Sequence, residues 1–344
     1  MDLIPRNIRA LTSPRAVNNY FPTNRARNRS IDKPANVSRG DANMTNYEGW
    51  QFDQYILHRL IGRGGFSDVY RAWDDNLNRW VAIKVLHKDL SDKELEKFFE
   101  EARIMANLRH PHIITIFEFN FVEVRQLNRY RKIPYFVMDY APNGSLAQRH
   151  PHAEILPMDT IMQYLEQIVD ALEYIHNYRR DNHRLVHQDI KPANILLGAN
   201  DEILISDFGI ARFVQNTRSQ AISISEEDWV GTAIYMAPER FRGQPSPATD
   251  QYALGIILYE WLTGSYPFYG TNTEIMRQQL YTPPPPLRKI SLDISPAVEQ
   301  VVLKALHKNP HTRFKSVREL LSALDEARHP SFPRSLIEFL RGNY

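Results

Sequence analysis

The first half of the chain alternates apolar and polar residues over short runs, a pattern that predicts β-strands. YILHRLIGRGGFSDVYRAWD, residues 55–74, predicts two strands joined by a glycine-rich turn, and RWVAIKVL, residues 79–86, predicts a third. HPHIITIFEF and IPYFVMDYA, residues 110–119 and 133–141, predict two more strands, separated by the polar and basic RQLNRYRK. We therefore expect five strands before residue 142.

A single helix is predicted among these strands. In DKELEKFFEEARIMANL, residues 92–108, apolar residues recur at spacings of three or four, at Leu95, Phe98, Ala102, Met105 and Leu108. That spacing is typical of an amphipathic helix with one buried face. The first part of the chain is therefore expected to combine five strands with one main helix.

After Gly144 the apolar pattern becomes helical. Residues 160–177 are periodic, residues 250–264 predict a buried helix, and residues 295–308 and 316–327 predict amphipathic helices. The chain is thus predicted to be an α+β protein, with a strand-rich first lobe and a mainly helical second lobe.

Composition narrows the class of protein. A chain of 344 residues with 43% hydrophobic residues can form two modest lobes around substantial cores. It contains no cysteine, which excludes a disulfide framework, a thiolate metal site and a cysteine nucleophile. No run approaches the roughly 20 apolar residues that span a bilayer, and the N-terminus lacks the apolar core of a signal peptide. We therefore expect a cytoplasmic protein without a membrane span.

The formal net charge of +2 conceals an uneven distribution. Residues 1–49 hold eight Lys and Arg against four Asp and Glu, which leaves 34 against 36 for the remainder. A nearly neutral body argues against a nucleic-acid-binding surface. Residues 1–49 lack periodic apolar positions, so a disordered basic arm is predicted. Within it NRARNRS, residues 24–30, is either a solvated tail or a docking contact.

The glycine-rich turn and a lysine in the third predicted strand suggest an anion-binding site. Gly62, Gly64 and Gly65 lack side chains, so their backbone N–H groups can approach a polyphosphate, although such a turn can also be purely structural. Lys84 lies in VAIK among apolar residues, where an ammonium costs free energy unless an anion meets it. The alternative is a lysine at a sheet edge whose ammonium reaches solvent.

Glu101 is a candidate partner for Lys84. It follows Phe98 by three residues and precedes Met105 by four, which places it at the edge of the buried helix face. A carboxylate at that position needs a cation, and Lys84 can supply it. The alternative is a local pair with Lys97, four residues earlier.

Two further motifs make the assignment specific. LVHQDIKPANILL, residues 185–197, holds Asp189 and Asn194 in the spacing D-x-x-x-x-N, and Asp207 begins a D-F-G directly after an apolar strand. With the glycine-rich turn, V-A-I-K and the helix glutamate in the same order, the chain resembles the eukaryotic-type (Hanks-type) serine/threonine protein kinase family over about residues 55–328. The resemblance implies a bilobal protein-kinase-like fold with a five-stranded antiparallel N-lobe.

The resemblance implies a binding site for ATP and Mg²⁺. The glycines Gly62, Gly64 and Gly65 and the apolar Val69 and Ala82 would enclose the nucleotide. Lys84, oriented by Glu101, would bind the phosphates, and Asn194 and Asp207 would hold Mg²⁺, an ion that prefers hard oxygen ligands. Met138 would guard the back of the site, and the segment from Asp139 to Ala141 would bind the adenine edge.

The resemblance also implies the transfer chemistry. Asp189 would orient the attacking hydroxyl and accept its proton, and Lys191 would stabilise the γ-phosphate. GTAIYMAPE, residues 231–239, resembles the substrate-docking segment of Ser/Thr kinases, with Thr232 contacting Asp189 and Lys191. Proteins with Ser or Thr acceptors are the implied substrates.

Three further residues would support this segment and the catalytic loop. Glu239 and Arg313 would form an anchoring ion pair. Asp250 would brace the backbone of the catalytic loop.

Two positions depart from the family pattern. Ser67 replaces the third glycine of the turn, and Gln188 replaces the usual arginine before Asp189. That arginine pairs with a phosphorylated residue of the activation segment, which a neutral amide cannot do. We expect activity that does not depend on phosphorylation of the activation segment. The acidic run SEEDW, residues 225–229, either provides permanent negative charge in place of a phosphorylated residue or is only a solvated face.

Alternatives from other classes are a pseudokinase that binds nucleotide without transfer, and a kinase-fold enzyme acting on a small molecule. Lys84, Asp189, Asn194 and Asp207 disfavour the first, and the GTAIYMAPE segment disfavours the second. The expected organisation is the arm at 1–49, an N-lobe at 50–141, a C-lobe at 142–330 and a short tail at 331–344.

Overall fold

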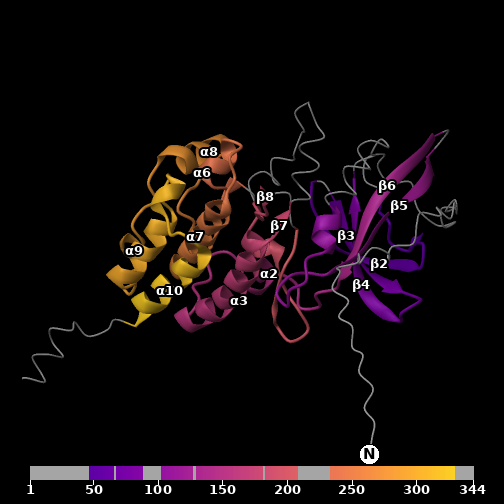
Figure 1. Cartoon of the computed structure of the whole chain (residues 1–344), viewed down its shortest axis with the longest axis horizontal. Helices are drawn as coiled ribbons and strands as arrows, with labels where there is room; N and C mark the ends of the chain where they lie inside the picture. The colour runs from indigo at the N-terminus through magenta and orange to yellow at the C-terminus, as the bar shows by residue number, and fades with distance from the viewer. Residues whose placement is uncertain are drawn as a thin grey trace, which may run out of the picture.

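The computed structural model describes residues 46–65, 67–87, 102–126, 129–180, 183–207 and 233–329. Its six-stranded sheet lies in one half of the molecule and most of its helices lie in the other (Figure 1). We call these halves the N-lobe, up to Asp139, and the C-lobe, from Leu146 onward. The arrangement confirms the α+β class predicted from the sequence.

The N-lobe is built on one antiparallel sheet with the strand order β1-β2-β3-β4-β6-β5. The strands are β1 (Gln51–Phe52), β2 (Tyr55–Arg63), β3 (Ser67–Asp74), β4 (Arg79–Leu86), β5 (Ile116–Gln126) and β6 (Arg129–Asp139). The five predicted strands are all present, and β4 has the predicted bounds. The additional strand, β1, pairs only two residues with β2, too few for an alternating pattern to reveal it.

One face of this sheet is covered by an aromatic cluster at the start of the described chain. Tyr47, Trp50 and Phe52 are buried against Tyr70 and Tyr135. The Tyr47 ring meets the rings of Trp50 and Phe52 edge-on at centroid distances of 5.3 and 5.6 Å. Packing of the N-lobe therefore includes Tyr47, which lies inside the segment assigned to the arm. Residues 1–45 lie outside the described part of the chain.

The β5–β6 hairpin is longer than the sheet that carries it. β6 pairs with β4 only through residues 135–139, but its pairing with β5 continues to Arg129. The remaining residues of the hairpin form a two-stranded ribbon that projects beyond the other strands (Figure 1). Residues 125–126 and 129–132 of the basic segment RQLNRYRK belong to the two strands of this hairpin.

The C-lobe consists mainly of helices. They are α2 (Leu146–Arg149), α3 (Met158–Asn177), α6 (Pro238–Phe241), α7 (Pro247–Thr263), α8 (Asn272–Tyr281), α9 (Pro296–Ala305) and α10 (Val317–Arg328), with 3₁₀ turns at Pro192–Asn194, Leu287–Lys289 and Pro310–Thr312. Two small hairpins join them, β7 (Arg179–Arg180) with β8 (His183–Arg184) and β9 (Ile195–Leu197) with β10 (Ile203–Ile205). Among the described helices, none has both the length and the apolar character that a bilayer crossing requires.

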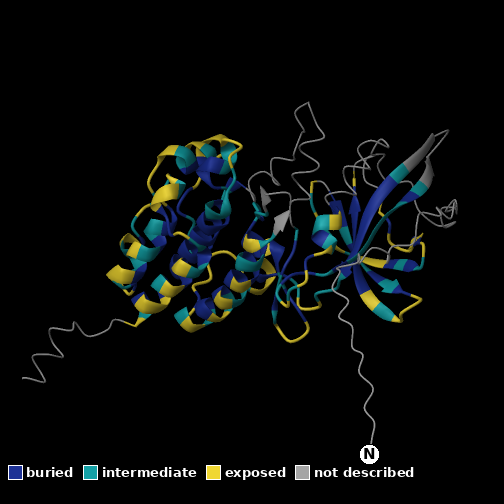
Figure 2. Ribbon diagram, in the orientation of Figure 1, coloured by how far each residue is buried: buried dark blue, intermediate teal, exposed yellow. Residues whose placement is uncertain are grey.

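The core of the C-lobe forms around α7. Every residue of α7 from Thr249 to Thr263 is buried, whereas the outer helices keep exposed faces (Figure 2). At Gly255 an added Cβ would lie 2.9 Å from Leu306 Cδ2, so glycine is needed for the close packing of α7 on the residues that end α9. The helix ends at Gly264, whose φ of 67° is left-handed and therefore favours glycine.

Candidate active site

The glycine-rich turn lies between β2 and β3. The Gly64 N–H donates to Ser67 O at 2.9 Å and closes the turn. A Cβ at Gly62 would lie 3.6 Å from Val69 Cβ, and a Cβ at Gly64 would lie 3.6 Å from Ser67 O, both ordinary contacts. The fold itself therefore does not need glycine at these two positions. Gly65 is exposed at the same turn.

Lys84 is buried in the N-lobe and pairs with Asp207 of the C-lobe. The Lys84 ammonium donates to Asp207 Oδ1, and the exposed fractions of the two side chains are 8% and 34%. The anion that the apolar surroundings of Lys84 require is thus supplied from the other lobe. Glu101, the partner expected from the sequence, lies outside the described residues.

Asn194 and Asp207 are brought together by the β9–β10 hairpin. Ile195 pairs with Ile205 in this ladder. One residue beyond that pair, Ser206 donates both its N–H and its hydroxyl to Asn194 O, at 2.9 and 3.0 Å. Asp207 follows directly, with a left-handed φ of 67°. The turn in the backbone at Asp207 therefore occurs beside Asn194.

Asp189 is surrounded by donors. Asn194 Nδ2 donates to both the backbone oxygen and Oδ2 of Asp189, each at 2.8 Å, and Lys191 Nζ lies 3.2 Å from Oδ2. Burial alone would raise the pKa of Asp189, but the cations of Lys191 and Arg240 outweigh it, and the pKa lies below its ordinary value. Asp189 is therefore a carboxylate at neutral pH.

Asp250 at the start of α7 braces the backbone that carries Asp189. It accepts the N–H of His187 at 3.0 Å and that of Gln188 at 2.7 Å, and His176 Nε2 lies 2.7 Å from its Oδ2. These contacts confirm the bracing role predicted for Asp250. Gln188 has a left-handed φ of 70°, which this pair of backbone bonds helps to hold.

His187 is held in one tautomer. Nε2 donates to Ser206 O at 2.9 Å, and Nδ1 accepts the Asp189 N–H at 3.2 Å. The acceptor role leaves Nδ1 without a proton, so the ring is neutral. Burial lowers the pKa of His187 below its ordinary value, in agreement with this geometry.

The remaining nucleotide-site candidates lie at the end of β6 and beside it. Met138 is 6% exposed and pairs in register with Ala82 of β4. The Asp139 N–H donates to Thr115 O at 3.0 Å, so this donor is already engaged. Ala141 follows β6 and is half-buried. Val69 is half-buried and pairs with Lys84 between β3 and β4.

The predicted ion pair between Glu239 and Arg313 is confirmed. Arg313 donates to both carboxylate oxygens of Glu239, at 2.7 and 2.9 Å, and both residues are buried. Thr249 Oγ1 donates to the same carboxylate at 3.0 Å, and Arg313 also reaches Ala248 O at 2.7 Å. These bonds fix α6 to the start of α7.

Arg240 is the residue at this site that sequence reasoning missed. It lies on α6 next to Glu239, and its Nη1 is 3.4 Å from Asp189 Oδ1. Its side chain is 15% exposed. The signal in the sequence was only its place beside the anchored Glu239, because the contact with Asp189 spans 51 positions and depends on the tertiary fold.

Several expectations fall outside the described residues. These concern Thr232, the acidic run 225–229 and the other residues from 210 to 231 of the activation segment, which extends from Ile210 to Met236. The response of the site to phosphorylation of that segment therefore stays a prediction.

The donor set at Asn194 and Asp207 suits Mg²⁺. The two hydrogen bonds donated by Asn194 Nδ2 fix its amide, and its Oδ1 accepts no hydrogen bond from a described residue. Carboxylate and amide oxygens are hard ligands of the kind that Mg²⁺ takes together with phosphate oxygens and water. Among the described residues, no group of three or more His, Asp or Glu could hold a metal ion by itself.

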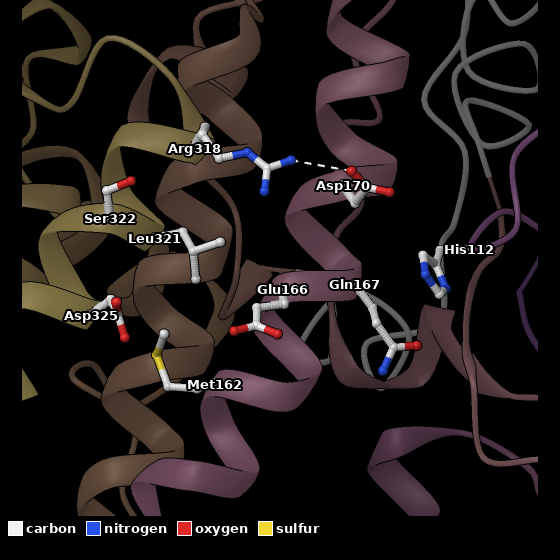
Figure 3. Close-up of a pocket in the computed structure, with 9 residues that line it drawn as sticks. All are labelled: His112, Met162, Glu166, Gln167, Asp170, Arg318, Leu321, Ser322 and Asp325. Carbon is white, nitrogen blue, oxygen red and sulfur yellow. Dashed lines mark hydrogen bonds and ion pairs between the residues drawn. The ribbon is translucent and has the colours of Figure 1, made fainter.

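A cavity of about 480 Å³ lies apart from these residues, between α3 and α10 (Figure 3). Arg318 of α10 crosses it to Asp170 of α3, with Nη2 and Oδ1 3.2 Å apart, and its Nε donates to Glu173 at 2.8 Å. None of the site residues predicted from the sequence lines this cavity. Its ion pairs hold α10 against α3.

Comparison with known proteins agrees with this geometry. The model of the family "Protein kinase domain" matches residues 55–324. The chain is 34% identical over 294 residues to the serine/threonine-protein kinase PknB of Mycolicibacterium smegmatis, a match covering 83% of this chain and 45% of that protein. It is 35% identical over 277 residues to PknB of Mycobacterium tuberculosis, covering 79% and 42%. The chain thus spans less than half the length of these relatives.

A solved structure gives the same result. The crystal structure of the Mycobacterium tuberculosis PknI kinase domain matches with a TM-score of 0.60 and 26% identity, covering 82% of this chain and all of that one. The protein kinase fold expected from the sequence is confirmed. Since the family model spans most of the described chain and holds Lys84, Asp189, Asn194 and Asp207 within it, the chain belongs to the protein kinase family, alongside bacterial Hanks-type serine/threonine kinases.

Proposed function

We propose that the chain transfers the γ-phosphoryl group of ATP to serine and threonine hydroxyls of proteins. The observation that carries this proposal is the meeting of two clusters from different lobes. Lys84 of the N-lobe pairs with Asp207, and Asp207 follows Ser206, which is bonded to Asn194, the residue that holds Asp189. Cation, metal-ligand candidates and general-base candidate are thus linked through consecutive contacts.

Each residue has a distinct role in the proposed reaction. Lys84 binds phosphate oxygens of ATP, and the backbone of Gly62, Gly64 and Gly65 covers them. Asn194 and Asp207 would hold Mg²⁺, which would supply positive charge against the negative charge of the phosphates. Asp189 accepts the proton of the acceptor hydroxyl while the new O–P bond forms, the bond to the leaving oxygen breaks and ADP departs. Lys191 stabilises the transferred group.

The glycines support this assignment of the turn. A side chain would fit the fold at Gly62 and at Gly64. We therefore infer that glycine at these positions lets a ligand approach the backbone closely. The segment from Asp139 to Ala141 offers one further contribution. With the Asp139 N–H occupied by Thr115, the Ala141 N–H is the proposed donor to the adenine edge.

The test is transfer of radiolabelled phosphate from ATP with Mg²⁺ to a generic basic protein and to a Ser/Thr peptide. Label on protein with the wild type, lost in Asp189→Asn and kept in Asp293→Asn, supports the proposal. Asp293 is an exposed carboxylate remote in sequence from the site, so it controls for the loss of a charge. Binding of ATP without transfer to any acceptor identifies a pseudokinase, and ATP consumption only with an added small molecule identifies an enzyme of another substrate class.

We further propose that activity does not depend on phosphorylation of the activation segment. The support is Gln188, whose neutral side chain cannot form the charge-assisted bidentate pair that arginine makes with a phosphate. Its backbone N–H is held by Asp250, a residue outside that segment. Initial rates are measured before and after phosphatase treatment and are expected to agree within about twofold. Complete loss of activity after treatment would contradict this proposal and leave the kinase assignment intact.

A further inference from the structure

The carboxylate of Asp189 has two differently occupied oxygens. Oδ2 is held by Asn194 Nδ2 at 2.8 Å and lies 3.2 Å from Lys191 Nζ, both from the same loop. Oδ1 is approached by Arg240 Nη1 at 3.4 Å, from α6. Oδ1 is therefore the oxygen left for an acceptor hydroxyl, and a guanidinium lies at that position.

The guanidinium of Arg240 makes few hydrogen bonds to the described residues. A guanidinium carries five N–H donors, and the long contact with Asp189 is the one hydrogen bond it makes to a described residue. Its side chain is nevertheless mostly buried, at 15% exposure. A guanidinium whose other donors have no partner among the described residues can bind a further anion.

The backbone of Arg240 is fixed, whereas its side chain can rotate toward another partner. Its neighbour Glu239 is locked by the two bonds from Arg313 and one from Thr249. Rotation of the side chain about its own bonds can therefore carry the guanidinium from Asp189 to a group beside it without moving α6. The arginine fork matches a carboxylate in a bidentate pair, which is shorter and stronger than the present contact.

We propose that Arg240 determines acceptor specificity by binding an Asp or Glu carboxylate of the substrate close to the phosphorylated hydroxyl. The inference rests on the proposed kinase function. When an acidic side chain takes the guanidinium, Oδ1 of Asp189 becomes free to accept the hydrogen bond of the Ser or Thr hydroxyl. With a neutral acceptor, Arg240 stays on Asp189 and competes with that hydroxyl. Arg240 thus couples recognition of an acidic neighbour to exposure of the general base.

The experiment compares peptides that share one serine and differ by Glu or Gln at single positions from three before to three after it. The wild type is expected to show kcat/KM at least tenfold higher for Glu than for Gln at one or two positions next to the serine. In Arg240→Gln this ratio is expected to fall to about one. Arg240→Glu is expected to favour a Lys peptide at the same position.

Arg242→Gln is the matched control. Arg242 is exposed at the end of the same helix and makes no contact with Asp189. Its substitution removes the same charge as Arg240→Gln, so the Arg242→Gln variant should keep the preference for the Glu peptide. Arg240→Lys keeps a cation without the fork and should keep a reduced preference.

Equal rates on Glu and Gln peptides in the wild type, or a ratio unchanged in Arg240→Gln, would overturn the inference. The wild-type comparison stands even if the variant folds poorly. Transfer to both peptides without preference leaves the proposed function standing, whereas absence of transfer to any peptide or protein counts against the function itself.

Discussion

Lys84 and Asp207 form an ion pair between residues 123 positions apart, one on β4 and the other just after β10. The ammonium is buried and the carboxylate is partly exposed. The pair therefore links the sheet of the N-lobe directly to the catalytic part of the C-lobe. Because the lysine has more than one N–H donor, it can keep Asp207 and still contact phosphate oxygens.

Lys84→Met is predicted to lower phosphoryl transfer by at least about 100-fold, since a preorganised cation at a developing negative charge contributes several kcal/mol. The fold should persist, because methionine fills a similar volume and Asp207 keeps access to water. Initial rates and thermal melting measure the two effects. Lys315→Met, which removes an exposed lysine of the C-lobe, is expected to leave both unchanged. Full activity in Lys84→Met would contradict the role of Lys84.

Gly62→Ala separates the needs of the fold from those of a ligand. The added methyl group meets Val69 Cβ at an ordinary 3.6 Å, so the melting temperature should be unchanged or slightly raised. Affinity for Mg·ATP should fall about tenfold, equivalent to about 1.4 kcal/mol, because the methyl group holds the phosphates away from the backbone. Calorimetric titration measures that affinity.

Gly255→Ala serves as the opposite control for the glycine substitution. Its added Cβ lies 2.9 Å from Leu306 Cδ2, so it should lower the melting temperature and leave the affinity of the folded protein for Mg·ATP unchanged. If Gly62→Ala destabilised the protein as strongly as Gly255→Ala, the glycine would be structural.

The elements that could be predicted from the sequence are those long enough to show a period. The eight-residue β4 and the buried α7 follow directly from their apolar patterns. The two-residue β1 and the four-residue α2 and α6 each span about one period, so no pattern repeats within them, and tertiary contacts define them. The cluster of Tyr47, Trp50 and Phe52 was missed for the same reason, because isolated aromatic residues do not reveal what they pack against.

In the site, too, some residues could be predicted from the sequence and one could not. Asp189, Asn194 and Asp207 belong to motifs that resemble those of the kinase family, and that resemblance implied that they meet at one site. Arg240 belongs to no such motif, and nothing local distinguishes it from the exposed Arg242. What distinguishes Arg240 is its contact with Asp189, made from a helix whose neighbouring residue Glu239 is bound by Arg313. The contact between Arg240 and Asp189 joins residues 51 positions apart and depends on the tertiary fold, so the spacing of residues along the chain does not reveal it.

Arg313→Leu is predicted to destabilise the protein by about 3–5 kcal/mol, because it leaves the buried Glu239 carboxylate without its cation. The double variant with Glu239→Leu should lose much less than the sum of the two single changes, since no buried charge remains. Urea denaturation of all three variants gives this coupling. Arg328→Ala breaks an exposed pair with Asp159 and should cost less than about 1 kcal/mol. Additive losses at Arg313 and Glu239 would exclude coupling.

His187 is predicted to make stability fall as the pH drops below 6.5, the ordinary pKa of histidine. Its pKa in the folded protein is lowered by burial, so below pH 6.5 the unfolded chain binds a proton that the folded chain refuses. Stability is therefore fully present above pH 6.5 and is lost as the pH approaches the folded pKa. The lowered pKa of Asp189 acts in a separate window, because that contribution is lost only below 3.8.

Melting temperatures between pH 7.5 and 5 test this dependence. His187→Asn should melt lower than the wild type at pH 7.5, because the bonds to Ser206 and Asp189 change, and its melting temperature should vary less with pH. His110, whose pKa is also lowered by burial, must be separated from His187. In His110→Asn the slope between pH 6.5 and 5 should shrink but remain, since the proton refused by the buried His187 ring still favours the unfolded chain. A slope that vanishes in His110→Asn and persists in His187→Asn would assign the effect to His110 instead.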